Sequence, residues 1–514
     1  MFSHRRAGLP LTLSLALSAA PLRAQEAVIQ KAPVSPRYAA WVAYHMPRGL
    51  PGPAGGGKEG GQRTRGYVPS PVDLSHVHGP IFTGGAGTPP FPPAYDLRAL
   101  GQLTPVKDQG IYGTCWTFAC MGALEGSLRK AGLGSRDLSE WHLAYYGYVP
   151  FNQSLLVAFT PGTPAYGTDP IFDQGGSDWQ SAAILGRGTG AVDDSACPYQ
   201  TGLYNPRPIP AGNLPNGKEP LAAPLCGVYY LFSQDDPINV PDVKYALTRF
   251  GPVVVAMDWE DDNFDQASSA YRDPATTAWS LNHEVCIVGW DDAYAPAHFP
   301  EGNRPVAPGA WIVRNSWGPT WAEQGYFHLS YDSVVYDGTA FVGGARTTRR
   351  IRQYDPLGWC GSRGFGGPTA YCANVFRTDQ AETLTAAAFY AGAVNTAYEL
   401  QIRTNVNGDP GTGVPVTANG STPDWQGLLA APGFHVVPLD PPVTVPAGSC
   451  YAVVLKLTTP GYDYPVPVQE PVPGYSESSR CASGRSYLSE DGKIWQDLAS
   501  PGGGAVVCLK VFTE

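Results

Sequence analysis

Side chains with the chemistry to hydrolyse an amide bond lie at the ends of regular segments of this chain. Cys115 stands at the start of an apolar run, residues 116–124, whose spacing is that of one face of an α-helix. Unpaired backbone N–H groups and the helix dipole favour a thiolate over a thiol at such a position. His283 opens one strand-like apolar segment, and Asn315 closes another. Gln109 lies shortly before Cys115.

Each of these residues also has an ordinary structural explanation. A cysteine in an apolar helix is commonly a core residue, a histidine beside a strand is commonly satisfied locally, and an asparagine at a strand end is commonly a turn residue. Together they meet a specific need. A thiol nucleophile requires a histidine to take its proton, a third group to orient that histidine, and a donor facing the oxyanion. The set therefore predicts thiol-dependent catalysis.

The same residues belong to a longer series of short motifs. In chain order these are Thr104 to Gly110, Gly113 to Phe118, Leu138-Ser139-Glu140, Gly175-Gly176, Gly251-Pro252-Val253, Asn282-His283, Asn315 to Gly318, Trp321 and Gly325-Tyr326. Their identity and order resemble the papain family of cysteine peptidases over about residues 90–335. A series that keeps its order and spacing is much more specific than any single triplet.

The resemblance implies a role for each matching residue. Cys115 would be the nucleophile and His283 its imidazolium partner. Asn315 would orient His283, and Trp317 would shield the bond between them from water. Gln109, with the backbone N–H of Cys115, would form the oxyanion hole.

The resemblance also implies where a substrate lies. Backbone groups of Gly175 and Gly176 would bind it as an added strand. The residue after the histidine, Glu284, would line the pocket for the second side chain upstream of the cleaved bond, with Asp178 nearby. If Glu284 faces that pocket, Arg or Lys is favoured there. If instead it points away, it pairs with a surface cation.

Three departures from the family pattern stand out. Tyr112 occupies a position where the family usually has a cysteine, and the partner cysteine near Gly175 is also absent. Residues 145–172 have the length of an enlarged insertion. The family's long helical pro-segment signature is not recognisable in residues 25–89, which leaves autoinhibition by that route without support from the sequence.

Shifts in composition divide the chain. Residues 1–24 have the basic start, short apolar core and small final residue of a secretory signal. Residues 25–89 contain a Gly/Pro-rich linker and are expected to be an N-terminal extension or pro-segment. Residues 90–349 hold every motif above. Residues 350–514 alternate short apolar segments with turn residues, which predicts an all-β sandwich.

The expected fold class is therefore α+β: a papain-like two-lobed peptidase domain, with a helical lobe and a β-barrel-like lobe, followed by the sandwich. Residues 484–489 and 491–495 resemble the lectin-like domain appended to some prokaryotic papain-type peptidases. Such a domain could bind a carbohydrate or cell-surface ligand. Alternatively, it packs on the peptidase domain and binds nothing.

Charge and composition exclude other classes. The net charge of −10 comes without a basic stripe, which argues against a nucleic-acid partner. After the signal, no apolar run is long enough for a transmembrane anchor. The chain is thus expected to be secreted, periplasmic or at the cell surface. Its chemistry calls for no cofactor and no metal.

Ten cysteines in an exported chain predict disulfides. Cys120 and Cys286 lie within apolar segments and are expected to be buried thiols. Candidate bridges are Cys197–Cys226, Cys360–Cys372 and one pair among Cys450, Cys481 and Cys508.

The leading functional hypothesis is an endopeptidase acting on protein or peptide substrates. A second is a catalytically silent adhesin or carbohydrate-binding protein on a peptidase scaffold, which the intact Cys115, His283, Asn315 and Gln109 disfavour. A third is acyl transfer to an amine through the same thioester, which the sequence leaves open.

Overall fold

A computed structural model gives the fold of this chain. It describes residues 27–45, 66–82, 90–151, 158–159, 171–201, 211–231, 239–273, 280–345, 350–417, 425–499 and 504–514. The predicted signal, residues 1–24, and much of the predicted insertion at residues 145–172 lie outside the described residues. Within the described residues, no helix has both the length and the apolar character needed to cross a membrane.

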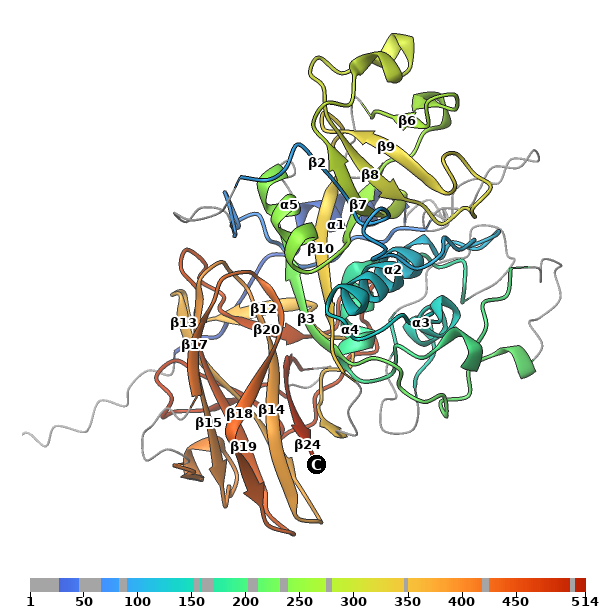
Figure 1. The fold of residues 1–514 in the computed structure, drawn as a ribbon. Coiled ribbons are helices and arrows are strands. Elements are labelled where there is room, and N and C mark those ends of the chain that lie inside the picture. Colours follow the sequence, from blue (N-terminus) through green and yellow to red (C-terminus); the bar gives the residue numbers. More distant parts are fainter. Residues whose placement is uncertain are drawn as a thin grey trace, which may run out of the picture.

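Helices and strands form two neighbouring bodies (Figure 1). The helices of the described residues are α1 (Pro36–His45), α2 (Cys115–Lys130), α3 (Glu140–Tyr148), α4 (Asp178–Gly186) and α5 (Val240–Arg249). The strands before residue 345 are β1 (Gln30–Lys31), β2 (Ala94–Asp96), β3 (Leu225–Tyr230), β4 (Val253–Met257), β5 (Phe264–Asp265), β6 (Ala270–Tyr271), β7 (His283–Asp291), β8 (Ala310–Arg314), β9 (Tyr326–Ser330) and β10 (Tyr336–Gly343).

Helix α2 is the centre of the first body. All its residues from Cys115 to Leu128 are buried, because the helix packs on α3 and α4 on one side and on β7 and β10 on the other. A helix buried all round needs apolar and small residues on every face, as its sequence provides. Its last turn carries Arg129 and Lys130, cations that suit the negative end of the helix dipole. These contacts make a helical lobe and a β lobe, as the sequence predicts.

The second body is a sandwich of antiparallel strands. Its strands are β11 (Arg350–Arg352), β12 (Gly361–Gly364), β13 (Thr369–Arg377), β14 (Glu382–Ala391), β15 (Thr396–Thr404), β16 (Val414–Pro415), β17 (Trp425–Leu429), β18 (Gly433–Val445), β19 (Cys450–Thr458), β20 (Val466–Gln469), β21 (Ser486–Ser489), β22 (Gln496–Asp497), β23 (Val506–Val507) and β24 (Leu509–Thr513). One sheet holds the order β16-β15-β19-β13-β21-β22. Apolar side chains of this sheet and of β14, β18 and β24 share one core. The predicted α+β class with a C-terminal all-β sandwich is confirmed.

The two bodies share a hydrogen-bonded sheet, which the sequence pattern does not reveal. Its order runs β11-β24-β14-β18-β3-β10-β4-β7-β8-β9-β6-β5. The junction is β18 against β3, where Phe434 pairs with Val228 and His435 with Gly227. The sandwich is therefore joined to the peptidase-like body through backbone hydrogen bonds as well as through side-chain packing.

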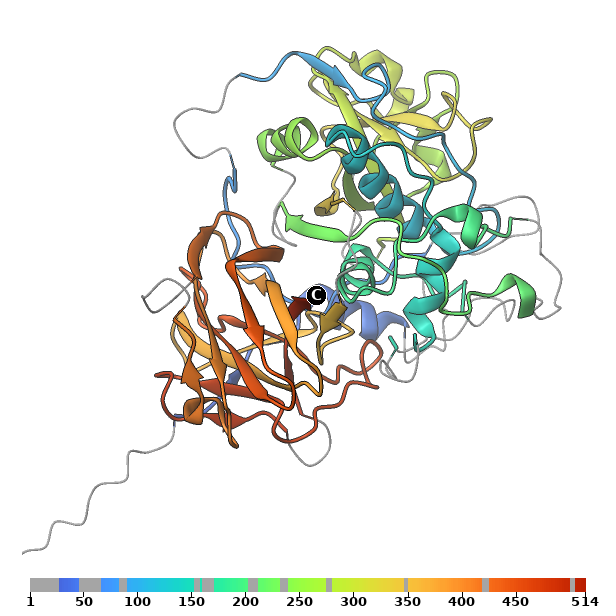
Figure 2. The ribbon, with the colours of Figure 1, turned by 60° about the horizontal axis from the view of Figure 1, so that its bottom comes forward.

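The N-terminal extension touches both bodies (Figure 2). Strand β1 pairs antiparallel with β12, with Gln30 opposite Gly364, so it adds a strand to the sandwich. Helix α1 follows, and the Tyr38 hydroxyl donates to the Pro473 carbonyl at 2.6 Å. Residues 66–82 then run against the first body, where the backbone N–H of Val68 donates to the Gly176 carbonyl at 2.9 Å.

All ten cysteines are free thiols, so the predicted disulfides are absent from this structure. Cys360 and Cys372 lie in different apolar cores, and Cys197 is buried whereas Cys226 is exposed. The spacing of cysteines along the chain did not convey this separation. Cys450, Cys481 and Cys508 are likewise unpaired, while Cys120 and Cys286 are buried thiols as expected.

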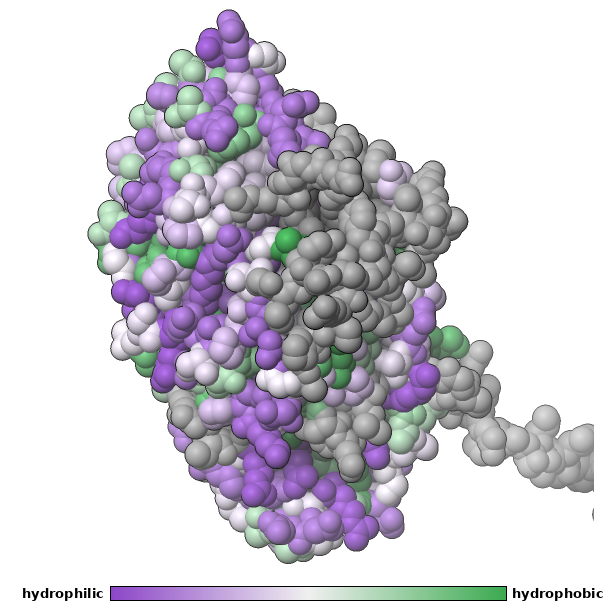
Figure 3. Space-filling model, turned by 90° about the vertical axis from the view of Figure 1, so that its right-hand side faces the viewer, coloured by the Kyte–Doolittle hydropathy of each residue, from purple (hydrophilic) through white to green (hydrophobic). Residues whose placement is uncertain are grey.

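The side of the molecule that carries α3 in Figure 1 presents a mainly hydrophilic surface. Figure 3 shows polar side chains over most of the described part of this face, with apolar ones scattered between them. Scattered apolar side chains of this kind are normal on a folded protein and mark no site by themselves.

Candidate active site

Cys115 is the first residue of α2 and is fully buried. The backbone of Gly66 covers it: the Gly66 N–H donates to Sγ at 3.3 Å, and the thiol donates to the Gly66 carbonyl at 3.4 Å. Burial raises the pKa of the Cys115 thiol to about 12, against which backbone hydrogen bonding from Glu284 and Gly66 works. In the covered state, burial therefore opposes the thiolate that the helix start favours.

His283 and Asn315 are brought together as the resemblance implies. His283 begins β7 and Asn315 follows the end of β8, and the two strands pair side by side. The His283 Nε2 and the Asn315 Oδ1 are 2.9 Å apart. The indole of Trp317 stacks on the imidazole, with ring centroids 4.9 Å apart and an angle of 24° between the planes. Both the histidine and the asparagine are buried, and Trp317 covers one face of the imidazole.

The thiol lies at the same strand end as this pair. The sulfur of Cys115 contacts the backbone N–H of Glu284, the residue that follows His283. Cys115, His283 and Asn315 thus come from α2, β7 and the turn after β8.

Gln109 is buried in the turn that leads to α2, and its side-chain amide is held at both ends. The Ser316 hydroxyl donates to its Oε1 at 2.5 Å, and its Nε2 donates to the Tyr112 carbonyl at 2.8 Å. The nitrogen end thus lies at Tyr112, three residues before the start of α2. A donor in that position is what an oxyanion at Cys115 requires.

Gly175 and Gly176 adopt backbone conformations that only glycine tolerates readily, with φ of +75° and +157°. A Cβ on Gly176 would also lie 2.5 Å from the Trp116 ring. The Gly176 carbonyl accepts from the Val68 N–H, so an extended chain already lies where the sequence places the substrate. That chain is the protein's own residues 66–68.

Asp178 and Glu284 lie together, beside the thiol. The Asp178 backbone N–H donates to the Glu284 Oε1 at 3.1 Å, and the Thr339 hydroxyl donates to the Asp178 Oδ2 at 2.5 Å. Glu284 is only 1% exposed, so the alternative in which it pairs with a surface cation is wrong. Burial, reinforced by the neighbouring carboxyl group, raises the pKa of Glu284 well above its ordinary value. Burial also raises the pKa of Asp178, reinforced by the nearby Asp337.

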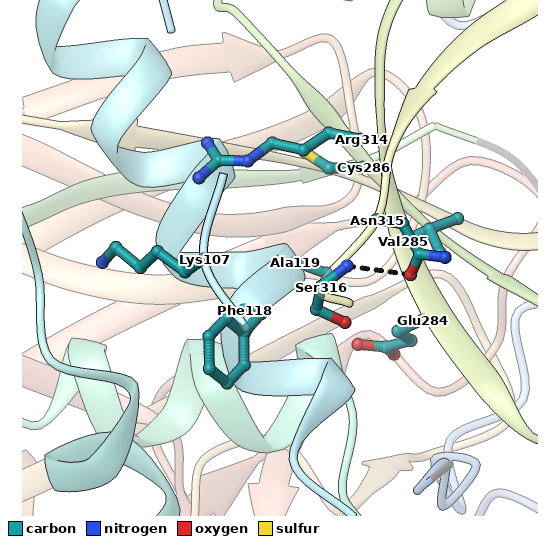
Figure 4. A pocket seen from close by; sticks show the side chains of 9 residues that line it. All are labelled: Lys107, Phe118, Ala119, Glu284, Val285, Cys286, Arg314, Asn315 and Ser316. Atoms are coloured by element: carbon teal, nitrogen blue, oxygen red, sulfur yellow. Dashed lines mark hydrogen bonds between the residues drawn. The ribbon is translucent and has the colours of Figure 1, made fainter. Parts of the chain in front are cut away.

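Figure 4 shows what lies on the other side of Glu284. Lys107 and Arg314, two cations of the adjoining pocket, lie at the far end of it from the Glu284 carboxylate. Lys107 bonds to Glu125 at 3.0 Å and to Glu140 at 2.8 Å. Arg314 donates to the Pro105 carbonyl at 2.6 Å. These two side chains tie α2 and α3 to the β lobe and brace the site.

Sequence reasoning missed the residues that come from outside the family motifs. Gly66, Tyr67 and Val68 cover the site, and Arg37 reaches Asp337 in the same region at 3.0 Å. Gly66 and Val68 act through backbone groups, which leave no pattern of side-chain types. Arg37 and Asp337 lie far apart along the chain, so no local spacing connects them.

Fold and site together define a class: cysteine peptidases with two lobes and a thiol at a helix start. Residues 91–145 and 174–339 match the model of the papain family cysteine protease, and residues 351–513 match that of the lectin like domain. The chain therefore contains a domain of the papain family of cysteine proteases, followed by a lectin-like domain.

Curated relatives match about half of this chain. A cathepsin L-like peptidase of Aedes aegypti is 29% identical over 260 residues, which are 48% of this chain and 62% of that protein. Cathepsin L of Sarcophaga peregrina is 30% identical over 257 residues, 48% of this chain and 63% of that protein. The chain thus spans less than two thirds of the length of these relatives.

One solved structure resembles nearly the whole fold. It contains the cysteine protease and lectin-like domains of Cwp84, a surface layer associated protein of Clostridium difficile. The TM-score is 0.73 at 22% identity, with 95% of this chain and 98% of that chain covered. A clostridial Cwp84 structure after propeptide cleavage gives a TM-score of 0.66 at 24% identity, covering 82% of this chain and 99% of that chain. At these identities the likeness concerns the fold.

Proposed function

We propose that this protein is a secreted cysteine endopeptidase that uses Cys115 as nucleophile and is silent while its own residues 66–68 cover that thiol. The observation that carries the proposal is the placement of the Cys115 thiol at the start of β7, where His283 and Asn315 are paired at 2.9 Å. Departure of the cover would return water and substrate to the thiol and remove the burial that raises its pKa.

The proposed reaction proceeds through a thioester. His283 takes the Cys115 proton, and Sγ attacks the carbonyl carbon of the scissile bond. The resulting oxyanion accepts hydrogen bonds from the Gln109 side-chain amide and the Cys115 backbone N–H. His283 then gives its proton to the leaving amine, and water attacks the thioester to release the second product and restore the thiol.

Active-site labelling tests this proposal directly. The full chain is treated with an epoxysuccinyl inhibitor before and after limited proteolysis, and the labelled residue is mapped by mass spectrometry. We expect weak labelling before proteolysis, then labelling of Cys115 together with loss of casein hydrolysis. Cys120 and Cys286 are matched controls, because both are buried thiols of the same domain. A label on another cysteine, or hydrolysis that survives full labelling of Cys115, would refute the assignment.

For the outer parts of the chain we propose export through residues 1–24 and a peptidase domain spanning residues 90–349. An exported protein whose first residue is Gln25 would support export.

The sandwich, residues 350–514, is proposed to brace the peptidase, because β18 of the sandwich pairs with β3 of the peptidase-like body. A fragment of residues 90–349 should then be less soluble and less stable than the full chain, and equal stability would contradict the bracing role.

We also propose that the lectin-like domain binds a carbohydrate. It rests on the family match alone. An array of bacterial and host glycans probed with the full chain tests it, and an array without signal would remove glycan binding from the proposal.

A further inference from the structure

Acidic side chains from separate elements form a buried cluster beside the candidate nucleophile. Asp178 begins α4, Glu284 is on β7, and Asp337 is on β10. All are buried, with Asp178 completely so. Placing several carboxyl groups in one buried region is unfavourable unless cations or shared protons accompany them.

The cation that accompanies them comes from the N-terminal extension. The guanidinium of Arg37 bonds to the Asp337 Oδ1 at 3.0 Å, with both side chains only 2% exposed. The same guanidinium lies over the Tyr336 ring, 4.1 Å from its centroid. The hydroxyl of Tyr67, a completely buried residue, donates to the Asp337 Oδ2. Arg37 and Tyr67 thus occupy the two oxygens of the Asp337 carboxylate.

Two further carboxyl groups lie beside this ion pair. Asp178 Oδ1 and Glu284 Oε2 are buried and accept from no amide, hydroxyl or cation of the described residues, and the two carboxyl groups form a side-chain hydrogen bond with each other. Lys107 and Arg314 lie at the far end of the adjoining pocket from the Glu284 carboxyl group (Figure 4). Asp178 and Glu284 are thus positioned to add acceptors to those that Asp337 offers to an organic cation.

The segment that covers the nucleophile also reaches the acidic cluster. Gly66 lies on the Cys115 sulfur, Tyr67 follows it, and Val68 donates to Gly176. The Tyr67 side chain thus reaches Asp337 from the residue next to the one that contacts the nucleophile. Residues 66–68 lie where a substrate would bind as an added strand. A substrate replacing residues 66–68 would present a side chain to Asp337 at the same place.

We propose that, once the extension leaves, Asp337 together with Glu284 and Asp178 binds the guanidinium or ammonium group of a substrate side chain, and that Arg37 is the built-in occupant of this site. The proposal rests on the proposed peptidase function and names its substrate class: polypeptides with Arg or Lys as the second residue upstream of the cleaved bond. Asp337 is the principal specificity residue, because it holds the cation in the covered state.

A positional-scanning peptide library, incubated with the full chain after limited proteolysis, tests the preference. We expect Arg and Lys at that position to be cleaved about 10- to 100-fold faster than Leu. Asp337→Asn should reduce this ratio to about threefold or less. The exposed Asp262 lies in the same lobe, and Asp262→Asn should keep the full ratio. A preference for Leu or Phe, or an Arg preference unchanged in Asp337→Asn, would overturn the inference while leaving the peptidase function intact. Loss of all cleavage, with Cys115 unlabelled, would instead refute the peptidase function.

Chemical rescue tests the cation site without any turnover. In full-length Arg37→Ala, millimolar ethylguanidinium should bind beside Asp337 and raise Tm, because it replaces the missing guanidinium. The same compound should leave the Tm of the wild-type chain and of Arg37→Ala/Asp337→Asn unchanged. Equal shifts in all the proteins, or none in Arg37→Ala, would show that Asp337 does not select a cation. If Arg37→Ala does not fold, the library measurement with Asp337→Asn decides alone.

Discussion

Two buried polar centres lie side by side in the cleft, and they are completed in different ways. In the catalytic centre, Asn315 holds His283, and Ser316 holds Gln109, so the peptidase body supplies both partners of each bond. In the acidic cluster of Asp178, Glu284 and Asp337, the N-terminal extension supplies the partners of Asp337 instead. We therefore expect the first centre to keep its geometry if the extension leaves, and the second to lose its cation.

The largest effect should follow from removing the nucleophile. Cys115→Ala should lower peptide hydrolysis by at least ~10³-fold, since no other group can form the thioester. The fold should persist, because alanine is tolerated at a helix start and makes a small change in volume. Cys120→Ala, on the same helix, should retain activity. Hydrolysis of casein by Cys115→Ala at a rate near wild type would show that Cys115 is not the nucleophile.

Removing the oxyanion donor should have the next largest effect. Gln109→Ala should lower turnover by about 10- to 1000-fold with little change in KM, because the amide contacts the substrate oxygen only as charge develops. Single-turnover measurement of the acylation step is the appropriate readout. Gln102→Ala provides a control glutamine outside the site. An unchanged acylation rate would remove Gln109 from the oxyanion hole.

Crowding the cover should expose the thiol. A Cβ on Gly66 would lie 2.1 Å from the Gly113 carbonyl oxygen, so Gly66→Val cannot keep its place. Overpacking of this kind costs about 1–3 kcal/mol, which corresponds to a roughly 5- to 150-fold larger uncovered population. Alkylation of Cys115 by iodoacetamide in the full chain should accelerate accordingly. Pro80→Ala, an exposed change in the same segment, should not alter the rate, and an equal rate in Gly66→Val would show that Gly66 is no barrier.

The smallest effect should be on how Tm depends on pH, through Glu284 of the acidic cluster. Because burial raises the folded-state pKa of Glu284, its neutral form stabilises the fold at acid pH, and this stability is lost as pH rises through the raised value. Glu284→Gln stays neutral, so its Tm should fall less than that of wild type between pH 5 and pH 8, by roughly 2–4 °C. The exposed Glu301→Gln should behave like wild type. A Tm that falls in parallel for Glu284→Gln and wild type would mean that Glu284 is charged throughout.

The sequence predicted the centre that is built from local motifs. Cys115 begins α2, His283 begins β7 and Asn315 follows β8, so their positions followed once those elements were recognised. Gln109 lies in the turn before α2 and was identified through the family motif. Glu284 was correctly placed beside Asp178, although its burial was not evident from the strand pattern.

What the sequence did not predict depends on pairing between distant segments. The bonds from Gly66 and Val68 to the cleft use backbone atoms, and the pairing of β18 with β3 joins strand edges. Neither kind of contact constrains side-chain type. The raised pKa of Cys115 follows from the same cover, and the missing disulfides follow from cores that the spacing of cysteines does not distinguish.

The extension is anchored at two places, β1 on the sandwich and residues 66–68 in the cleft. It is consequently a bivalent ligand of its own protein. A cut between residues 46 and 65 leaves the cleft segment covalently attached through residues 83–90, and a cut between residues 83 and 89 leaves it held by β1 and α1. On the proposed function, the segment that stays tethered in either case would rebind at a high effective concentration, which is on the order of millimolar for short flexible tethers in general. Cleavage and opening would thus be separate events, and the rate at which both anchors dissociate would set the delay between them.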